Sequence, residues 1–125
     1  MKLKLNADWV VLSACNTGAA EGAGAEAVSG LGKAFFYAGT RALLVTMWPV
    51  ETTSAKQLVK GTFQFLNQNK ALSRSGAIRE SMLELIDKKQ LVDNTGKIVL
   101  SYAHPIFWAP FVMVGDPGQG GAVAR

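Results

Sequence analysis

The chain has 125 residues, of which 49% are hydrophobic and 18% charged, so it has room for one globular domain with its own core. Thirteen Lys and Arg residues against nine Asp and Glu give a net charge of +4, but the basic residues are spread along the chain. They form no run that could follow a phosphate backbone. Composition therefore argues against disorder and against nucleic-acid binding.

The lengths of the apolar stretches and the number of cysteines indicate in which cellular compartment the protein is found. The first residues contain no apolar stretch long enough for a signal peptide, and no later stretch approaches the length needed to cross a bilayer. The single cysteine, Cys15, cannot form an internal disulfide, which agrees with a reducing environment. We therefore expect a cytoplasmic protein with a free thiol and no membrane partner.

The first predicted elements are a strand, a helix and a second strand. The apolar run Val10–Leu12 predicts a strand that ends at small residues. Apolar residues recur at helical spacing over Glu21–Ala38, and Gly39 is placed to end that helix. The second run, Ala42–Trp48, ends at Pro49. Continuous rather than alternating apolar runs are typical of strands buried on both faces.

Two helices and a last strand are predicted after Pro49. The first helix spans about Thr53 to Gln68, with Thr52 or Thr53 as its N-cap. Its apolar stripe contains Ala55, Leu58, Val59, Thr62, Phe63 and Leu66. The second helix runs from Ser73 to about Lys89. Its inner side is predicted to contain Ile78, Met82, Leu85 and Ile86.

The remainder of the chain has one clear strand. The segment from Leu91 to Pro110 has no clear period and is predicted to be mostly loop, whereas Phe111–Val114 predicts a strand that ends at Gly115. The order of elements implies right-handed crossovers and helices covering a mainly parallel sheet, an α/β fold. Three strands make a thin sheet with open edges, so we expect further protein to cover it.

Cys15 is the main candidate for chemistry. Active sites in open parallel sheets gather beyond the carboxyl ends of the strands, and Cys15 follows the first strand and precedes a helix. Backbone N–H groups at such a position favour the thiolate, which is the nucleophilic form. Its neighbours are small enough for a substrate backbone to approach: Ser13, Asn16, Thr17 and Gly18. The alternative is that Cys15 is a small buried hydrophobe.

A dinucleotide site is the competing interpretation of the first helix. Gly22, Gly24 and Ala27 fit the letters of a G-x-G-x-x-A motif, with Glu51 as a ribose ligand. The spacing argues against it, because such glycines should turn the chain directly at the strand end. We therefore expect no cofactor. One Cys and one His without paired spacing also give no metal site.

Four motifs carry a family resemblance. The segments VVLSACNTG, GLGKAFFYAG, ALLVTMWPVE and HPIFWAPFVMVGD, in this order, strongly resemble the C-terminal half of CHAT domains, which are caspase-like domains often found beside tetratricopeptide repeats. The resemblance runs from about Asn6 to Asp116. It implies a three-layer caspase-like sandwich, with a mainly parallel sheet flanked by helices, in which residues 1–116 form the C-terminal part of the domain and residues 117–125 a Gly-rich tail.

The resemblance also implies a reaction. The family nucleophile is the Cys of an S-A-C-x-T motif, which falls on Cys15, and the chemistry is peptide-bond hydrolysis without a cofactor. The family's catalytic His lies in a T-H-G motif that this sequence does not contain. The only histidine, His104, matches a different family position, and we expect it to be structural, with hydrogen bonds near Trp108. The alternative to a peptidase is a non-catalytic caspase-like interaction module.

The loop after the second strand supplies the last candidates. Trp48 and Glu51 should lie on the same rim as Cys15, and in caspase-like enzymes this loop commonly helps bind the substrate. Glu51 would then favour a basic substrate residue, unless it is simply a solvated charge at a helix start. The expected partners are a protein or peptide substrate and tetratricopeptide repeat regions or other domains of a longer protein. A homodimer is one way to cover the open sheet edge.

Overall fold

The computed structural model describes residues 4–12, 23–88 and 90–118. The chain divides into two compact units, one made of Met1–Pro49 with Pro110–Pro117 and the other of Val50–Ala109 with Gly118–Arg125. The architecture is mixed α/β, with three α-helices and two small sheets in the described residues. The α/β class expected from the sequence is therefore present at this level.

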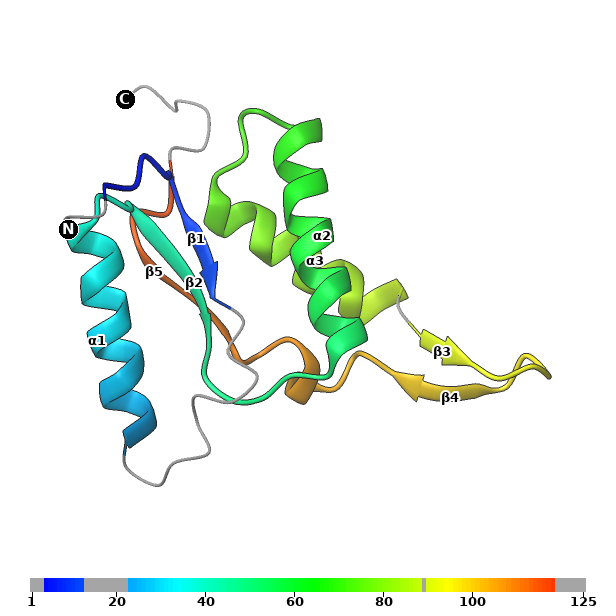
Figure 1. Cartoon of the computed structure of the whole chain (residues 1–125). Coiled ribbons are helices and arrows are strands. Elements are labelled where there is room, and N and C mark those ends of the chain that lie inside the picture. The colour runs from blue at the N-terminus through cyan, green and yellow to red at the C-terminus, as the bar shows by residue number, and fades with distance from the viewer. Residues whose placement is uncertain (1–3, 13–22, 89, 119–125) are drawn as a thin grey trace. The chain divides into compact units, whose positions relative to one another are not determined.

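The first unit contains a three-stranded sheet. Its strands are β1 (Val10–Leu12), β2 (Ala42–Thr46) and β5 (Phe111–Gly115), in the order β1-β2-β5 (Figure 1). β1 and β2 are parallel, with Leu12 opposite Val45. Every residue of β2 is buried, which explains its uninterrupted apolar sequence.

β5 does not run in the expected direction. It is antiparallel to β2, with Phe111 opposite Thr46, and the N–H of Met47 extends the ladder by donating to the Pro110 carbonyl at 2.9 Å. The sequence predicted a mainly parallel sheet, whereas one of the two strand pairings in this sheet is antiparallel. The handedness rule applies to a single strand–helix–strand crossover, whereas two helices and a hairpin separate β2 from β5 and allow the chain to re-enter the sheet in either direction.

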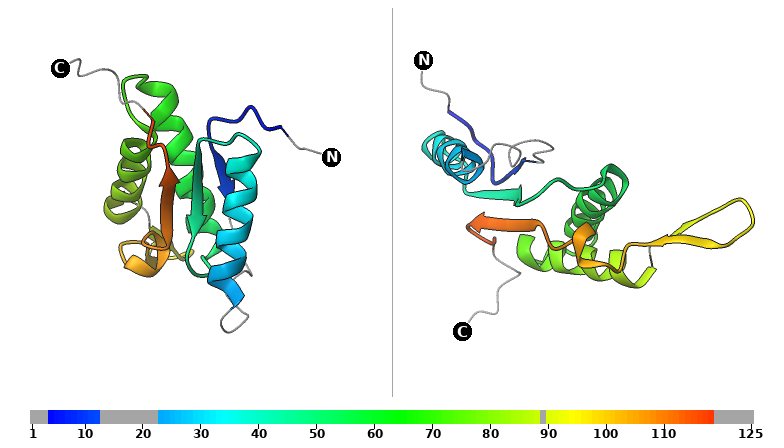
Figure 2. Two further views of the ribbon diagram at one scale, coloured as in Figure 1. Left: turned by 90° about the vertical axis from the view of Figure 1, so that its left-hand side faces the viewer. Right: turned by 90° about the horizontal axis from the view of Figure 1, so that it is seen from below.

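Helix α1 (Ala23–Tyr37) lies along one face of this sheet (Figure 2). A Cβ added at Gly32 would lie 3.4 Å from Leu43 Cδ1, and one added at Gly115 would lie 3.0 Å from the ring of Phe36. Glycine therefore lets the helix and the sheet approach closely at both places. The helix ends where the sequence predicted, because Gly39 takes a φ of 104°, in the left-handed region.

The second unit is built on helices α2 (Thr52–Gln68) and α3 (Arg74–Lys88), which pack against each other. Both predicted helices are confirmed to within a residue or two. The buried residues are Ser54, Leu58, Gly61 and Thr62 on α2, and Ala77, Ile78, Ser81 and Leu85 on α3. Phe63 was expected on the inner stripe of α2 but is 47% exposed, because small residues occupy the contact between the helices.

The segment predicted as loop contains regular structure. β3 (Gln90–Val92) and β4 (Ile98–Ser101) form an antiparallel hairpin, and a 3₁₀ turn, η1, follows at Pro105–Phe107 (Figure 1). The hairpin depends on a side-chain-supported turn rather than on a buried face, so hydrophobic periodicity could not reveal it.

Candidate functional site

The nucleophile candidate and its neighbours lie outside the described residues. This applies to Ser13, Cys15, Asn16, Thr17 and Gly18. The structure does describe the strand before them, β1, which ends at Leu12. The position of β1 in the sheet therefore gives the local context of Cys15.

The carboxyl ends of β1 and β2 share one edge of the sheet. Leu12 pairs with Val45, and Thr46 is the last residue of β2. Met47 and Trp48 follow at this edge, and their side chains are 61% and 41% exposed. Since β5 is antiparallel, its first residues meet the same edge through the Met47–Pro110 hydrogen bond. This edge of the sheet therefore exposes two large apolar side chains.

Glu51 caps helix α2. Its Oε1 accepts the N–H of Thr53 at 2.8 Å and its Oε2 accepts the N–H of Ser54 at 2.7 Å. The Ser54 hydroxyl donates back to the Glu51 carbonyl at 2.9 Å. The expectation of Thr52 or Thr53 as N-cap is wrong, because a carboxylate at the preceding position reaches both free N–H groups at once.

The cap changes the acidity of Glu51. Burial acts to raise the pKa of its carboxyl, but hydrogen bonds from Thr53 and Ser54 outweigh that effect and hold the pKa below its ordinary value of 4.5. Both carboxylate oxygens take part in helix capping. This geometry favours the interpretation that Glu51 is a charge at the start of a helix over the interpretation that it selects a basic residue in the substrate.

Tyr102 is a residue of this region that sequence reasoning missed. It is 3% exposed, and its ring meets that of Phe107 edge to face at 5.0 Å. Burial raises its pKa above 10.0, and the negative charge of Glu51 raises it further, while a hydrogen bond with Thr53 lowers it. Tyr102 therefore keeps its proton at neutral pH and links the start of α2 to the η1 turn. No periodic pattern surrounds it in the sequence.

His104 has the structural role expected of it. Its Nδ1 accepts the N–H of Ile106 at 3.2 Å and caps η1. Trp108 donates from Nε1 to the Ala103 carbonyl at 3.1 Å in the same turn. Protonation of the ring at Nδ1 would remove the cap, so capping and general-base catalysis are mutually exclusive uses of this nitrogen.

The other expected features are only partly visible. Among the aromatic residues around the last strand, Phe111 is buried, whereas Phe107 and Trp108 are half-buried. Gly22 lies outside the described residues, and Gly24 is already inside α1. In the described ranges, no three His, Cys, Asp or Glu side chains gather as a metal site requires. No helix in those ranges is long and apolar enough to span a bilayer.

Comparison with known proteins identifies the family. Residues 1–116 match the CHAT domain family, and the chain belongs to it. Tetratricopeptide repeat protein 28 from Homo sapiens is 28% identical over 92 residues, which cover 74% of this chain and 3% of that protein. The name of this relative agrees with the expected association with tetratricopeptide repeats. No solved structure gives a significant match.

Proposed function

We propose that this chain carries the nucleophile of a CHAT-type cysteine endopeptidase with a three-layer caspase-like fold. The observation that carries the proposal is the parallel pairing of β1 and β2, with Leu12 opposite Val45. Cys15 follows β1 in the sequence, and the exposed Met47 and Trp48 follow β2 at that edge. A nucleophile beside an apolar rim suits the recognition of a polypeptide substrate.

The reaction follows from the chemistry of a thiolate. Cys15 attacks the scissile carbonyl and forms a tetrahedral intermediate, whose oxyanion is held by backbone N–H groups. The intermediate expels the amine and leaves a thioester, which water then hydrolyses to release the acid and the thiol. A histidine from outside this chain takes the thiol proton and gives it to the leaving amine. No metal or organic cofactor takes part in these steps.

The first test is the reactivity of the thiol. The alkylation rate of Cys15 with iodoacetamide is measured against pH in the folded chain and in the same chain unfolded in urea. We expect the folded chain to react well below the normal thiol pKa of about 8.5, because local N–H dipoles favour the thiolate. Equal pH profiles in the two states, or protection of the folded thiol at all pH values, would contradict an activated nucleophile.

The second test uses a longer protein in which this chain completes a CHAT domain. A library of fluorogenic peptides is incubated with that protein, with a Cys15→Ser variant and with a Trp48→Ala variant. We expect Cys15→Ser to abolish cleavage, and Trp48→Ala to raise KM more than it lowers kcat, because Trp48 is assigned to substrate binding. A peptide series that varies only the charge beside the cleaved bond tests Glu51. Indifference to charge is expected if Glu51 only caps α2.

A non-catalytic interaction module is the second candidate. The observation that favours it is the capping role of His104, the only histidine of this chain. In this case the caspase-like scaffold works through its partners. A longer protein that cleaves no peptide in the library, and whose Cys15 behaves as an ordinary thiol, would support this function.

The proposed domain organisation follows the family. Residues 1–116 form the C-terminal part of a CHAT domain, and residues 117–125 form a tail. We expect the working protein to include tetratricopeptide repeats and to act on a protein or peptide in the cytoplasm. A homodimer would cover the open sheet edge, and sedimentation of the longer protein tests this assembly.

A further inference from the structure

One face of the sheet in the first unit is only partly covered by α1. A Cβ added at Gly32 would lie 3.4 Å from Leu43 Cδ1, so α1 lies on the face to which Leu43 points. Val114 is opposite Leu43 and shares this face, since paired residues point to the same side of a sheet. Val112, opposite Val45, does the same. Both β2 residues are buried, whereas the two valines of β5 are 40% and 43% exposed. The helix therefore covers β2 on this face and leaves β5 open (Figure 2).

Met47 extends this open surface to the carboxyl edge of β1 and β2. Its N–H donates to the Pro110 carbonyl at 2.9 Å, which continues the β2–β5 ladder by one position. Side chains alternate along a strand, so Met47, two residues after Val45, belongs to the same face. Val112 is its diagonal neighbour on β5, within reach of a long side chain. Met47 and Val112 together are called the apolar edge surface below.

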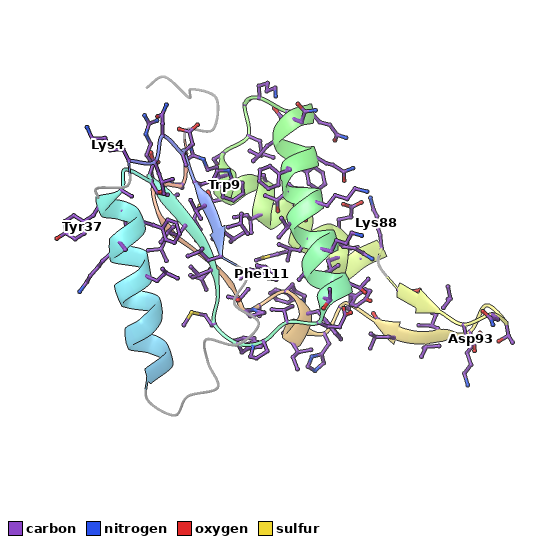
Figure 3. All side chains as sticks on the ribbon, in the orientation of Figure 1. Lys4, Trp9, Tyr37, Lys88, Asp93 and Phe111 are labelled. Atoms are coloured by element: carbon purple, nitrogen blue, oxygen red, sulfur yellow. The ribbon has the colours of Figure 1, made fainter. Side chains whose placement is uncertain are left out.

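The charged side chains of the first unit lie at the other end of the sheet. Arg41 precedes β2 and pairs with Asp8 at 3.2 Å, and its carbonyl accepts the N–H of Asp116, which follows β5. Lys33 lies in the last two turns of α1, and Lys4 is at this end of the sheet too (Figure 3). These are the charged groups of the unit whose side chains the structure describes. None of them is beside the apolar edge surface.

The next acidic residue after β2, Glu51, is already engaged. Its two carboxylate oxygens accept the N–H groups of Thr53 and Ser54 at the start of α2. A charged substrate residue at the apolar edge surface would lose water without gaining a partner among the described side chains, whichever its sign. A large apolar residue would instead bury the exposed surfaces of Met47 and Val112.

We propose that Met47 and Val112 select a large apolar substrate residue, such as leucine, methionine or phenylalanine, beside the cleaved bond. The inference rests on the proposed function, because the reaction at Cys15, which follows β1 in the sequence, brings the substrate to this edge. Met47 is the main specificity residue, since it is the more exposed of the two and its flexible thioether adapts to residues of different shape. The edge distinguishes apolar from charged residues, not one charge from the other.

The test uses three tripeptide chloromethyl ketones that alkylate the Cys15 thiol of the whole chain and differ only in the residue beside the ketone. That residue is leucine, lysine or glutamate. Each rate is divided by the rate with iodoacetamide, which corrects for the reactivity of the thiol itself. We expect the leucine probe to react at least about tenfold faster than either charged probe, and the two charged probes to react alike.

The outcomes separate this inference from the proposed function. Equal corrected rates for the three probes would overturn the apolar selection and leave an activated nucleophile intact. A faster lysine probe would overturn it in favour of an acidic selector, such as Glu21 or Glu26, whose side chains lie outside the described residues. A thiol with an ordinary iodoacetamide profile that reacts with none of the probes would contradict the proposed function and this inference with it.

Two opposite substitutions make the test specific to Met47. Met47→Asp should make the lysine probe the fastest, and Met47→Lys should make the glutamate probe the fastest. Loss of folding would remove a preference rather than reverse it. Val112→Ala should reduce the preference for leucine by about two- to threefold. Leu31→Asp is the matched control, since Leu31 is an exposed apolar residue of α1 in the same unit, and it should leave the rate ratios unchanged. No reversal in either Met47 variant, or the same changes in Leu31→Asp, would overturn the assignment.

Discussion

The hydroxyl of Ser81 on α3 donates a hydrogen bond of 2.6 Å to the backbone carbonyl of Leu58 on α2, opposite Gly61. The same carbonyl accepts a second hydrogen bond, from the Thr62 hydroxyl, at 2.8 Å. A Cβ at Gly61 would collide with the Ser81 oxygen. The close contact of the two helices therefore depends on a glycine and a serine that meet at one point.

Gly61→Ala should destabilise the second unit despite the better helix propensity of alanine. The propensity gain is about 1 kcal/mol, and overpacking a buried contact costs about 1–3 kcal/mol. Ser81→Ala alone should cost about 1 kcal/mol through the lost hydrogen bond. Removing the Ser81 oxygen relieves the collision, so the double variant should be more stable than Gly61→Ala alone. Urea denaturation of the four proteins gives the coupling energy, and strict additivity would contradict this geometry.

Helix positions were the part of the fold best predicted from sequence. The apolar stripe that contains Leu58 correctly predicted helix α2. Gly39 correctly predicted the C-terminal end of helix α1. The direction of β5 was not predictable in the same way. An apolar run such as Phe111–Val114 predicts a buried strand whether that strand is parallel or antiparallel to its neighbour. The β3–β4 hairpin was missed because its order comes from the hydrogen bonds of Asp93.

The sequence predicted strands on either side of the candidate site, but Cys15 itself lies outside the described residues. The shared edge of β1 and β2 follows from strand order alone. The role of Glu51 depends on which backbone N–H groups its carboxylate reaches, and this local geometry cannot be derived from the sequence. The neighbouring Thr and Ser residues are also good N-caps, so the sequence left the identity of the cap ambiguous. The role of Tyr102 depends on its tertiary contact with Phe107, and no pattern in the sequence indicates that contact.

Glu51→Ala should cost about 1 kcal/mol of stability at neutral pH through loss of the α2 cap. Because folding lowers the pKa of Glu51, its contribution is present above the ordinary value of 4.5 and is lost as pH falls through the lower folded value. The difference between Glu51→Ala and the unchanged protein should therefore shrink in acid. Denaturation midpoints from about pH 7 to about pH 3 measure it.

Two variants serve as controls for the cap. Glu51→Gln keeps one acceptor oxygen and loses the charge, so its loss of stability should be intermediate. Because glutamine does not titrate, residue 51 should add no pH dependence to the stability of this variant. Glu80→Ala removes a partly exposed carboxylate that pairs with the neighbouring Arg79, and it should cost less than about 0.5 kcal/mol. A constant difference between Glu51→Ala and the unchanged protein across the pH range would rule out a capping carboxylate.

Asp93→Ala should disorder the β3–β4 hairpin while leaving the helices intact. Hydrogen bonds from the Thr95 side chain and from the N–H groups of Lys97 and Thr95 lower the pKa of Asp93. The turn should therefore hold above the ordinary pKa of 3.8 and loosen as pH falls through the lowered value. Amide exchange of residues 90–101 measures this, with Asp87→Asn as a carboxylate-removal control that should leave the hairpin unchanged. Unaltered exchange in Asp93→Ala would show that the strands hold the hairpin alone.

Gly39→Ala should destabilise the first unit, because Gly39 has a φ of 104° and an added Cβ would lie 2.7 Å from the Leu5 carbonyl oxygen. The Leu5 N–H also donates to the Ala38 carbonyl at 2.6 Å, so the two segments cannot separate without losing that bond. The expected cost is about 1–3 kcal/mol. Gly30→Ala is the matched control, since Gly30 lies inside α1 with nothing within 4 Å of an added Cβ, and it should gain about 0.5–1 kcal/mol. Thermal unfolding of both variants should shift the midpoint in opposite directions, and a shift of the same sign would contradict the left-handed geometry at Gly39.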